Sequence, residues 1–152
     1  MAKVESRVVS DTGVLQGTVD ILGTIDILVD SPTGLGTGTD FRKQVGAGNY
    51  IYIPSEQKAY KIISINNKHQ VDYLEELWFE KAVTSAYSGV PKLINRYPTS
   101  TIVTNIGATS VIVNGTTFAA GESMMINLDS GTEPIMYDAT GGSLRIELIF
   151  GY

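Results

Sequence analysis

The sequence predicts an all-β fold, with a small β-barrel-like N-terminal domain followed by a small antiparallel β-sandwich and one short helix at most. Apolar and polar residues alternate along short runs, of which Leu144 to Phe150 is the clearest, and this period is typical of a strand with one buried face. The 16 glycines among 152 residues fall mainly between such runs, where glycine is typical of turns. Together these two features favour strands joined by tight turns.

A shift in composition at Pro98 divides the chain into the two predicted domains, residues 13–97 and residues 98–152. The first is expected to be the barrel and the second the sandwich. In the second, Asn114-Gly115 between two apolar runs is a strong signal for a two-residue hairpin. The predicted strands there are 101–106, 110–114, 124–128, 135–138 and 143–150.

The composition excludes several classes of function. The chain has no cysteine, which rules out disulfides and thiolate metal sites and is consistent with assembly in a reducing cytoplasm. A net charge of -5 provides no basic surface for nucleic acid. No run approaches the ~18 apolar residues of a membrane span, and the first residues lack the apolar core of a signal peptide. The chain is therefore expected to be soluble and unprocessed, with neither nucleic acid nor membrane as a partner.

The N-terminal third begins with polar, weakly patterned residues 1–12. They are expected to form an arm that is either flexible or ordered against a neighbouring subunit. A six-residue echo follows, in which residues 18–23 resemble residues 24–29 with strict apolar alternation. It predicts either two strands or one strand bent at Gly23. The polar side of this stretch carries three acids that are expected to be solvated or edge-blocking rather than metal ligands, namely Asp20, Asp26 and Asp30.

The stretch from Gly36 to Leu74 is predicted to be a compact β-unit whose turns are evident in the sequence. A glycine-rich corner leads to Phe41 and Val45, which are expected to be buried, and three short strands follow. The glycines invite comparison with a phosphate-binding loop. However, such a loop requires a lysine that is absent here, and β-type sequence rather than a helix follows the corner. The glycines are therefore interpreted as corner residues.

The same stretch carries a resemblance to a family. Its order is Gly36-Thr37-Gly38-Thr39, Phe41, the turn Gly46 to Gly48, Ile51 and Ile53, Tyr60 to Ile65, Asn66-Asn67, and Val71 to Leu74. This order resembles a small module repeated in virion structural proteins of tailed bacteriophages, and it covers roughly a quarter of the chain. The sequence departs from the module at Asn49, where an acidic residue is usual. Any role tied to that carboxylate is therefore in doubt.

The resemblance implies a structural subunit of a tailed-phage virion that is made in the host cytoplasm and acts through contacts between subunits. A capsid-associated protein is favoured, either a decoration or cement protein or a head accessory. The implied partners are copies of the chain and other virion proteins, foremost the major capsid protein. The alternatives are a tail, baseplate or head–tail connector component, or a module that binds carbohydrate or a host surface through exposed tyrosines.

The sequence argues against an enzyme, and neither a cofactor nor a metal site is predicted. His69, the single histidine, is expected in a surface turn without a recognisable serine or cysteine partner. The nearest candidates for a catalytic acid pair are Glu75, Glu76 and Glu80, and adjacent acids on a surface segment are usually solvated.

Contact surfaces are predicted from aromatic and apolar residues. Residues 73–87 show helical spacing, which predicts a strand to about Glu75 and then one or two helical turns. There, Trp78-Phe79 would either cap the barrel or anchor in a pocket of a partner.

Tyr50, Tyr52 and Tyr60 are expected to share one amphipathic face, which is either an ordinary half-buried face or a contact with another subunit or a glycan. The apolar C-terminal strand is expected either inside the second domain or in the sheet of a neighbouring subunit. The candidate interface residues are Trp78, Phe79, Tyr50, Tyr52, Ile149, Phe150 and Tyr152.

Overall fold

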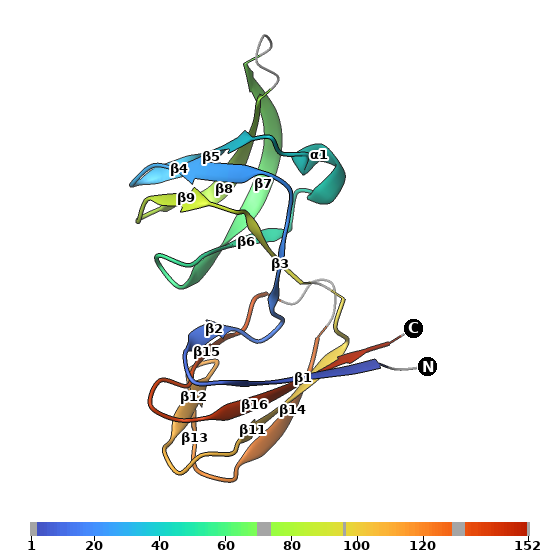
Figure 1. The fold of residues 1–152 in the computed structure, drawn as a ribbon, viewed down its shortest axis with the longest axis vertical. Coiled ribbons are helices and arrows are strands. Elements are labelled where there is room, and N and C mark those ends of the chain that lie inside the picture. Colours follow the sequence, from blue (N-terminus) through green and yellow to red (C-terminus); the bar gives the residue numbers. More distant parts are fainter. Residues whose placement is uncertain (1–2, 70–73, 96, 129–132, 152) are drawn as a thin grey trace. The chain divides into compact units, whose positions relative to one another are not determined.

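The computed structural model describes residues 3–69, 74–95, 97–128 and 133–151. They form two compact units (Figure 1). The barrel unit is Thr18–Ile94, and the sandwich unit combines Met1–Gly17 with Asn95–Tyr152. Most of the described chain is strand, which confirms the all-β prediction. The units do not follow one another along the chain, however, because the barrel unit is inserted into the sandwich unit.

The sandwich unit contains two four-stranded antiparallel sheets. The first has the order β1-β16-β11-β14, and the second the order β13-β12-β15-β2. Their bounds are β1 Lys3–Val9, β16 Leu144–Phe150, β11 Ser100–Asn105, β14 Ser123–Asn127, β13 Thr116–Phe118, β12 Val111–Val113, β15 Met136–Asp138 and β2 Thr12–Val14. The hairpin between β12 and β13 has positive φ at Asn114 (50°) and at Gly115 (76°). These values confirm the predicted two-residue turn.

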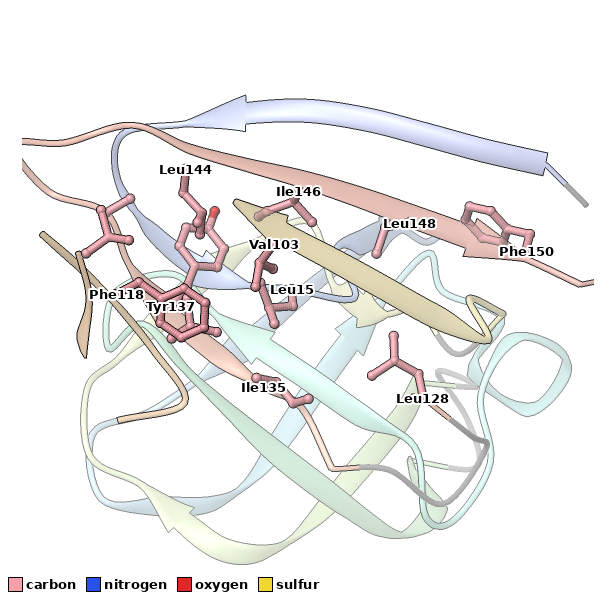
Figure 2. Close-up of a cluster of buried hydrophobic side chains, with 13 residues drawn as sticks. Leu15, Val103, Phe118, Leu128, Ile135, Tyr137, Leu144, Ile146, Leu148 and Phe150 are labelled. Carbon is pink, nitrogen blue, oxygen red and sulfur yellow. The ribbon is translucent and has the colours of Figure 1, made fainter. Parts of the chain in front are cut away.

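The core of the sandwich unit gathers the side chains of alternate residues from its strands. Along β16, Leu144, Ile146, Leu148 and Phe150 point to the same side and are buried with Val103 of β11 (Figure 2). Leu15, Phe118, Leu128, Ile135 and Tyr137 belong to the same cluster. Since a strand alternates its side chains between two faces, the alternation in the sequence was sufficient to identify this buried face.

The expectation of an N-terminal arm over residues 1–12 is wrong for the described part of that segment. Strand β1 pairs with β16 along its whole length, from Lys3 opposite Phe150 to Val9 opposite Leu144. After a bend at residues 10–11 the chain enters the second sheet as β2. Most side chains of β1 are exposed because it is an edge strand, which explains the polar sequence. Strand β16 lies between β1 and β11, so the C-terminal strand is internal, the first of the two alternatives.

The barrel unit is built from one antiparallel sheet of eight strands in the order β3-β10-β6-β7-β8-β5-β4-β9. Their bounds are β3 Thr18–Asp20, β10 Lys92–Ile94, β6 Tyr50–Ile53, β7 Lys58–His69, β8 Leu74–Val83, β5 Ser31–Thr37, β4 Thr24–Ile27 and β9 Tyr87–Gly89. Strand β3 leads directly into β4, and β9 leads directly into β10. Each of these two chain stretches therefore contributes a strand to both ends of the order. The Ile21 amide donates to the Pro91 carbonyl (3.1 Å) between them. The sheet therefore curls round on itself as a barrel.

The six-residue echo forms two strands separated by Gly23. This glycine has a φ of 86°, and a Cβ there would lie 2.5 Å from the Thr37 carbonyl oxygen. Asp20 and Asp26 within the repeats and Asp30 after them are exposed, as expected. Asp20 forms an ion pair with Lys92 (2.9 Å), and Asp26 accepts a hydrogen bond from Ser88 Oγ.

The helical turns expected after Glu75 are wrong. Residues 74–83 form β8, which lies between β7 and β5, and the described residues contain one short helix elsewhere, α1 (Phe41–Gln44). Leu77, Phe79 and Val83 face the barrel core, whereas Trp78 is exposed. The helical spacing therefore arose from Trp78, an apolar side chain on the outer face. Pairing on both sides of the strand overrides a weak local preference.

Candidate interaction surfaces

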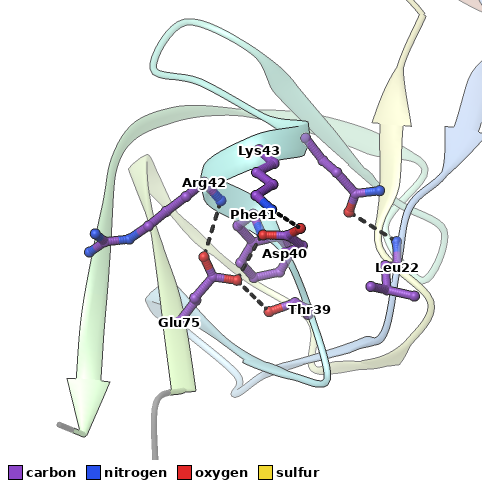
Figure 3. A network of polar contacts seen from close by, with 8 residues as sticks. Leu22, Thr39, Asp40, Phe41, Arg42, Lys43 and Glu75 are labelled. Atoms are coloured by element: carbon purple, nitrogen blue, oxygen red, sulfur yellow. Dashed lines mark hydrogen bonds and ion pairs between the residues drawn. The ribbon is translucent and has the colours of Figure 1, made fainter.

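The corner that carries the family resemblance is held by one buried carboxylate (Figure 3). Glu75 accepts hydrogen bonds from Thr39 Oγ1 (2.9 Å), the Phe41 amide (2.7 Å) and the Arg42 amide (3.1 Å). The two amides open α1, where backbone N–H groups have no partner within the helix. Phe41 is fully buried in the barrel core. Glu75, which sequence reasoning had considered only as a surface acid, is therefore the residue that fixes this corner.

The glycines and Asn49 also have structural roles in the corner. A Cβ on Gly36 would lie 2.6 Å from the Phe41 ring and from Thr39 Oγ1, and Gly38 has a φ of 66°. Asn49 Oδ1 accepts a hydrogen bond from the Gly46 amide (2.8 Å). A carboxylate oxygen could accept the same bond, so an acidic residue at this position could close the turn in the same way.

The structure brings three of the predicted contact residues to the outer face of β6 and β8, the two strands that flank β7. Tyr50 and Tyr52 lie on β6 opposite Lys61 and Ala59 of β7. Their neighbours along β6, Ile51 and Ile53, are fully buried, so the tyrosines face outward. Trp78 lies on the next strand but one, β8, and its side chain is 39% exposed. We call Tyr50, Tyr52, Ile63 and Trp78 the aromatic strip.

A β-bulge adds Ile63 to this strip. The β7–β8 register shifts between the pairs Ile62–Phe79 and Ser64–Trp78. One additional residue on β7 allows both Ile62 and Ile65 to pack in or against the barrel core, while Ile63 is 49% exposed. Such an irregularity redirects side chains. Nothing in the spacing of the sequence identified it.

Trp78 already has a partner for its polar atom. Its indole Nε1 donates to Glu76 Oε1 (2.8 Å), and Glu76 is buried. Glu75 and Glu76 therefore bind separate groups. With its N–H satisfied, the half-exposed indole presents mainly apolar surface.

Other predicted contact residues are not on the surface. Phe79 is buried in the barrel core, where its ring centroid lies 6.2 Å from that of Tyr60. Tyr60 pairs with Ile51 and is also buried, so it does not share the face of Tyr50 and Tyr52. Phe150 is buried in the sandwich core.

The remaining predictions fall at the chain end and at the β7 terminus. Ile149 is partly exposed on the outer face of β16, and Tyr152 lies outside the described residues. His69 was expected in a turn, but its backbone ends β7 and pairs with Leu74. The long β7 therefore extends through the residues that were predicted to form that turn.

Glu56 joins the β6–β7 turn to the segment after β8. It accepts hydrogen bonds from Tyr60 Oη, Thr84 Oγ1 and the Ser85 amide. Burial raises the pKa of Glu56, but the hydrogen bonds from Thr84, Tyr60 and Ser85 outweigh it and hold the pKa below the ordinary value of 4.5. The contact thus favours the ionised carboxylate.

Sequence reasoning missed two apolar pairs on the outer face of the first sandwich sheet. The register places Val4 beside Ile149 and Ile102 beside Met125, and the polar Ser100 and Glu147 lie on the same face next to these pairs. Met125 is 61% exposed, and Met124 on the other face of β14 is 47% exposed. The clue in the sequence was the uninterrupted apolar run Met124 to Ile126.

Within the described residues, no group of three or more His, Cys, Asp or Glu side chains is placed to hold a metal ion. No helix in that part of the chain has the length and apolar character needed to cross a membrane.

Comparison with known proteins identified no family for the chain. No family model matches it, and no curated protein matches it. Among solved structures, similarity was found to HutD from Pseudomonas fluorescens SBW25 in its formate condition, with 11% sequence identity, 98% of this chain and 78% of that chain covered, and a TM-score of 0.29. A similarity of this size supports no conclusion about fold or function.

Proposed function

We propose that the chain is a structural subunit of a tailed-phage virion, associated with the capsid as a decoration, cement or head-accessory protein. The observation that carries the proposal is the aromatic strip, because it places aromatic and apolar side chains on the outer face of the barrel sheet rather than in a core. Interfaces between proteins are enriched in aromatic residues. In a particle with many copies, modest contacts at each copy add up through avidity.

The resemblance of residues 36–74 to the phage module is the reason for proposing that the assembly is a phage particle. In the structure, residues that carry the resemblance position one another through Glu75, the Phe41 ring and the turn at Gly46. They form a scaffold that leaves the outer faces of the strands available for contact. The proposed division of roles is therefore a scaffold built by the module and contacts made by the aromatic strip.

Electron microscopy of intact particles that contain this chain, with antibody labelling, tests the proposal. We expect label on the capsid. The variant Trp78→Ala should reduce the number of copies per particle severalfold. The control Ile112→Ala, at a side chain 42% exposed in the sandwich unit, should leave that number unchanged. Label confined to the tail would refute the capsid assignment, and absence from the particle would refute the virion assignment.

A second candidate function is binding of carbohydrate. The observation that favours it is that Tyr50, Tyr52 and Trp78 point to the same outer face of the barrel sheet, since aromatic rings stack on the apolar faces of sugars. This function predicts saturable binding on a glycan array, with loss of binding in Trp78→Ala. An array without binding would exclude it for the glycans tested.

A further inference from the structure

The two edges of the first sandwich sheet differ in their chemistry. The edge strand β1 carries Lys3, Glu5 and Arg7 on one face. The opposite edge, β14, has the sequence Ser-Met-Met-Ile-Asn and contains no charged residue. Proteins usually protect an edge strand with charges, with proline or by making it very short. Strand β14 has none of these features, and both of its methionines are exposed.

Backbone geometry shows which groups of β14 face the free edge. The Leu128 amide donates to the Thr99 carbonyl (2.8 Å), and the Asn105 amide donates to the Glu122 carbonyl (2.9 Å). Even-numbered residues in this segment therefore direct their backbone groups toward β11. Because successive residues of a strand point their N–H and C=O groups in opposite directions, Ser123, Met125 and Asn127 direct theirs toward the free edge.

We propose that β14 pairs with β14 of a second copy of this chain across a two-fold axis at Met125. Antiparallel pairing with full overlap places Met125 opposite Met125 of the second copy and Ser123 opposite Asn127. These are the residues whose backbone groups face the free edge, so each pair can exchange two hydrogen bonds. The result is one continuous sheet through both copies. The inference specifies a self-contact within the proposed structural role and so rests on that function.

The side chains fit a second copy on both faces of the sheet. On one face Met125 meets its own counterpart, and on the other Met124 meets Ile126, so apolar groups cover one another. Glu122 falls opposite Leu128, and no two like charges face each other. If β14 paired instead with the β1 edge of another copy, Lys3, Glu5 and Arg7 would lie beside the apolar side chains of β14. The charged groups would then either contact these side chains or turn away to solvent. The uncharged edge therefore fits itself better than it fits β1.

Sedimentation of the full chain tests the inference. The wild type is expected at twice the monomer mass of 16.4 kDa. Met125→Lys and Met125→Glu should each return the chain to monomer mass, because two like charges then meet at the axis. An equimolar mixture of the two variants should restore the double mass through an opposite-charge pair. The control is Val8→Lys, at a side chain 57% exposed on the same face of the sheet in β1, and it should remain dimeric.

Amide hydrogen exchange of the wild type supplies a readout that needs no variant. Amides of Ser123, Met125 and Asn127 should become protected as concentration rises, whereas the already bonded amides of Met124 and Ile126 should change little. The inference would be overturned by a monomeric wild type or by a dimeric Met125→Lys. It would also be overturned by a mixture of the two variants that stays monomeric, or by odd-numbered amides that remain unprotected in the dimer. A monomer that still labels capsids would leave the virion proposal standing, and a dimer absent from particles would leave the self-pairing standing.

Discussion

Glu75 illustrates how one side chain can determine local structure. Its carboxylate joins the start of β8 to the start of α1 by accepting three hydrogen bonds from donors more than thirty residues earlier in the chain. In sequence it stands beside a second glutamate and resembles a solvated surface acid. The local sequence pattern could not distinguish a solvated Glu75 from a buried, hydrogen-bonded one, because its bonding partners are distant along the chain.

Replacing Glu75 by alanine should therefore destabilise the fold. The buried Phe41 amide would lose its acceptor, and an unsatisfied buried donor costs about 1–3 kcal/mol, so a total loss of about 2–4 kcal/mol is expected for the set of donors. Urea denaturation measures the change. The control Glu80→Ala removes a solvent-exposed ion pair with Lys61 (4.0 Å), which should cost less than about 1 kcal/mol. Equal losses in the two variants would contradict the role of Glu75.

Glu56 predicts a dependence of stability on pH. Its pKa is lowered in the folded chain, by hydrogen bonds that outweigh burial, so its contribution is present above the unfolded pKa of 4.5 and is lost as pH falls through the folded value. Wild type should exceed Glu56→Gln in stability near neutral pH, and the gap should narrow in acid below the unfolded pKa. Urea midpoints across this range measure it. A gap that is constant with pH would show that ionisation of Glu56 is not responsible.

At the scale of elements, the sequence predicted strands by alternation and turns by glycine, and both predictions hold where a strand is regular. Strand β16 and the Asn114-Gly115 hairpin are examples. The predictions failed where pairing partners decide the outcome. Strand β8 appeared helical because Trp78 adds an apolar group on its outer face, and β1 appeared to be an arm because an edge strand buries little of its side chains. Neither partner strand can be identified from local pattern.

The corner of the barrel unit gives a matched pair of glycine variants. Gly36→Ala would place a Cβ 2.6 Å from the Phe41 ring, and overpacking of this kind costs about 1–3 kcal/mol. Gly46→Ala meets nothing within 4 Å and should be neutral or slightly stabilising, because it reduces the freedom of the unfolded chain. Thermal unfolding of the two variants distinguishes them. A Gly36→Ala protein as stable as Gly46→Ala would contradict the close approach.

At the scale of the whole molecule, the chain contains two cores, one in each unit. The sequence correctly predicted a barrel and a sandwich but placed their boundary by composition, which follows chain order. The insertion depends instead on pairing between β1 and β16, at opposite ends of the chain. For the candidate contact residues, the outward-facing position of Trp78, Tyr50 and Tyr52 could be anticipated from the sequence, although the two tyrosines are half-buried. The bulge at Ile63 and the free edge of β14 follow from register, which the sequence does not specify.

The insertion predicts that each unit folds by itself. Residues 18–94 expressed alone should give cooperative unfolding and a dispersed amide spectrum, because their core is complete without the sandwich. A chain in which a short Gly-Ser linker replaces residues 18–94 should likewise retain the sandwich. A molten spectrum for either product would show that its core requires the other unit.

The point of insertion has a practical consequence. The Asn95 amide donates to the Gly17 carbonyl (2.9 Å), so the chain leaves the sandwich unit and returns to it at one hydrogen-bonded position. Any foreign polypeptide whose ends lie close together could be grafted between these two residues without stretching the host strands. Such a graft would replace the barrel unit and with it the aromatic strip, so the sandwich unit would act as a carrier for a foreign domain with both chain termini unmodified.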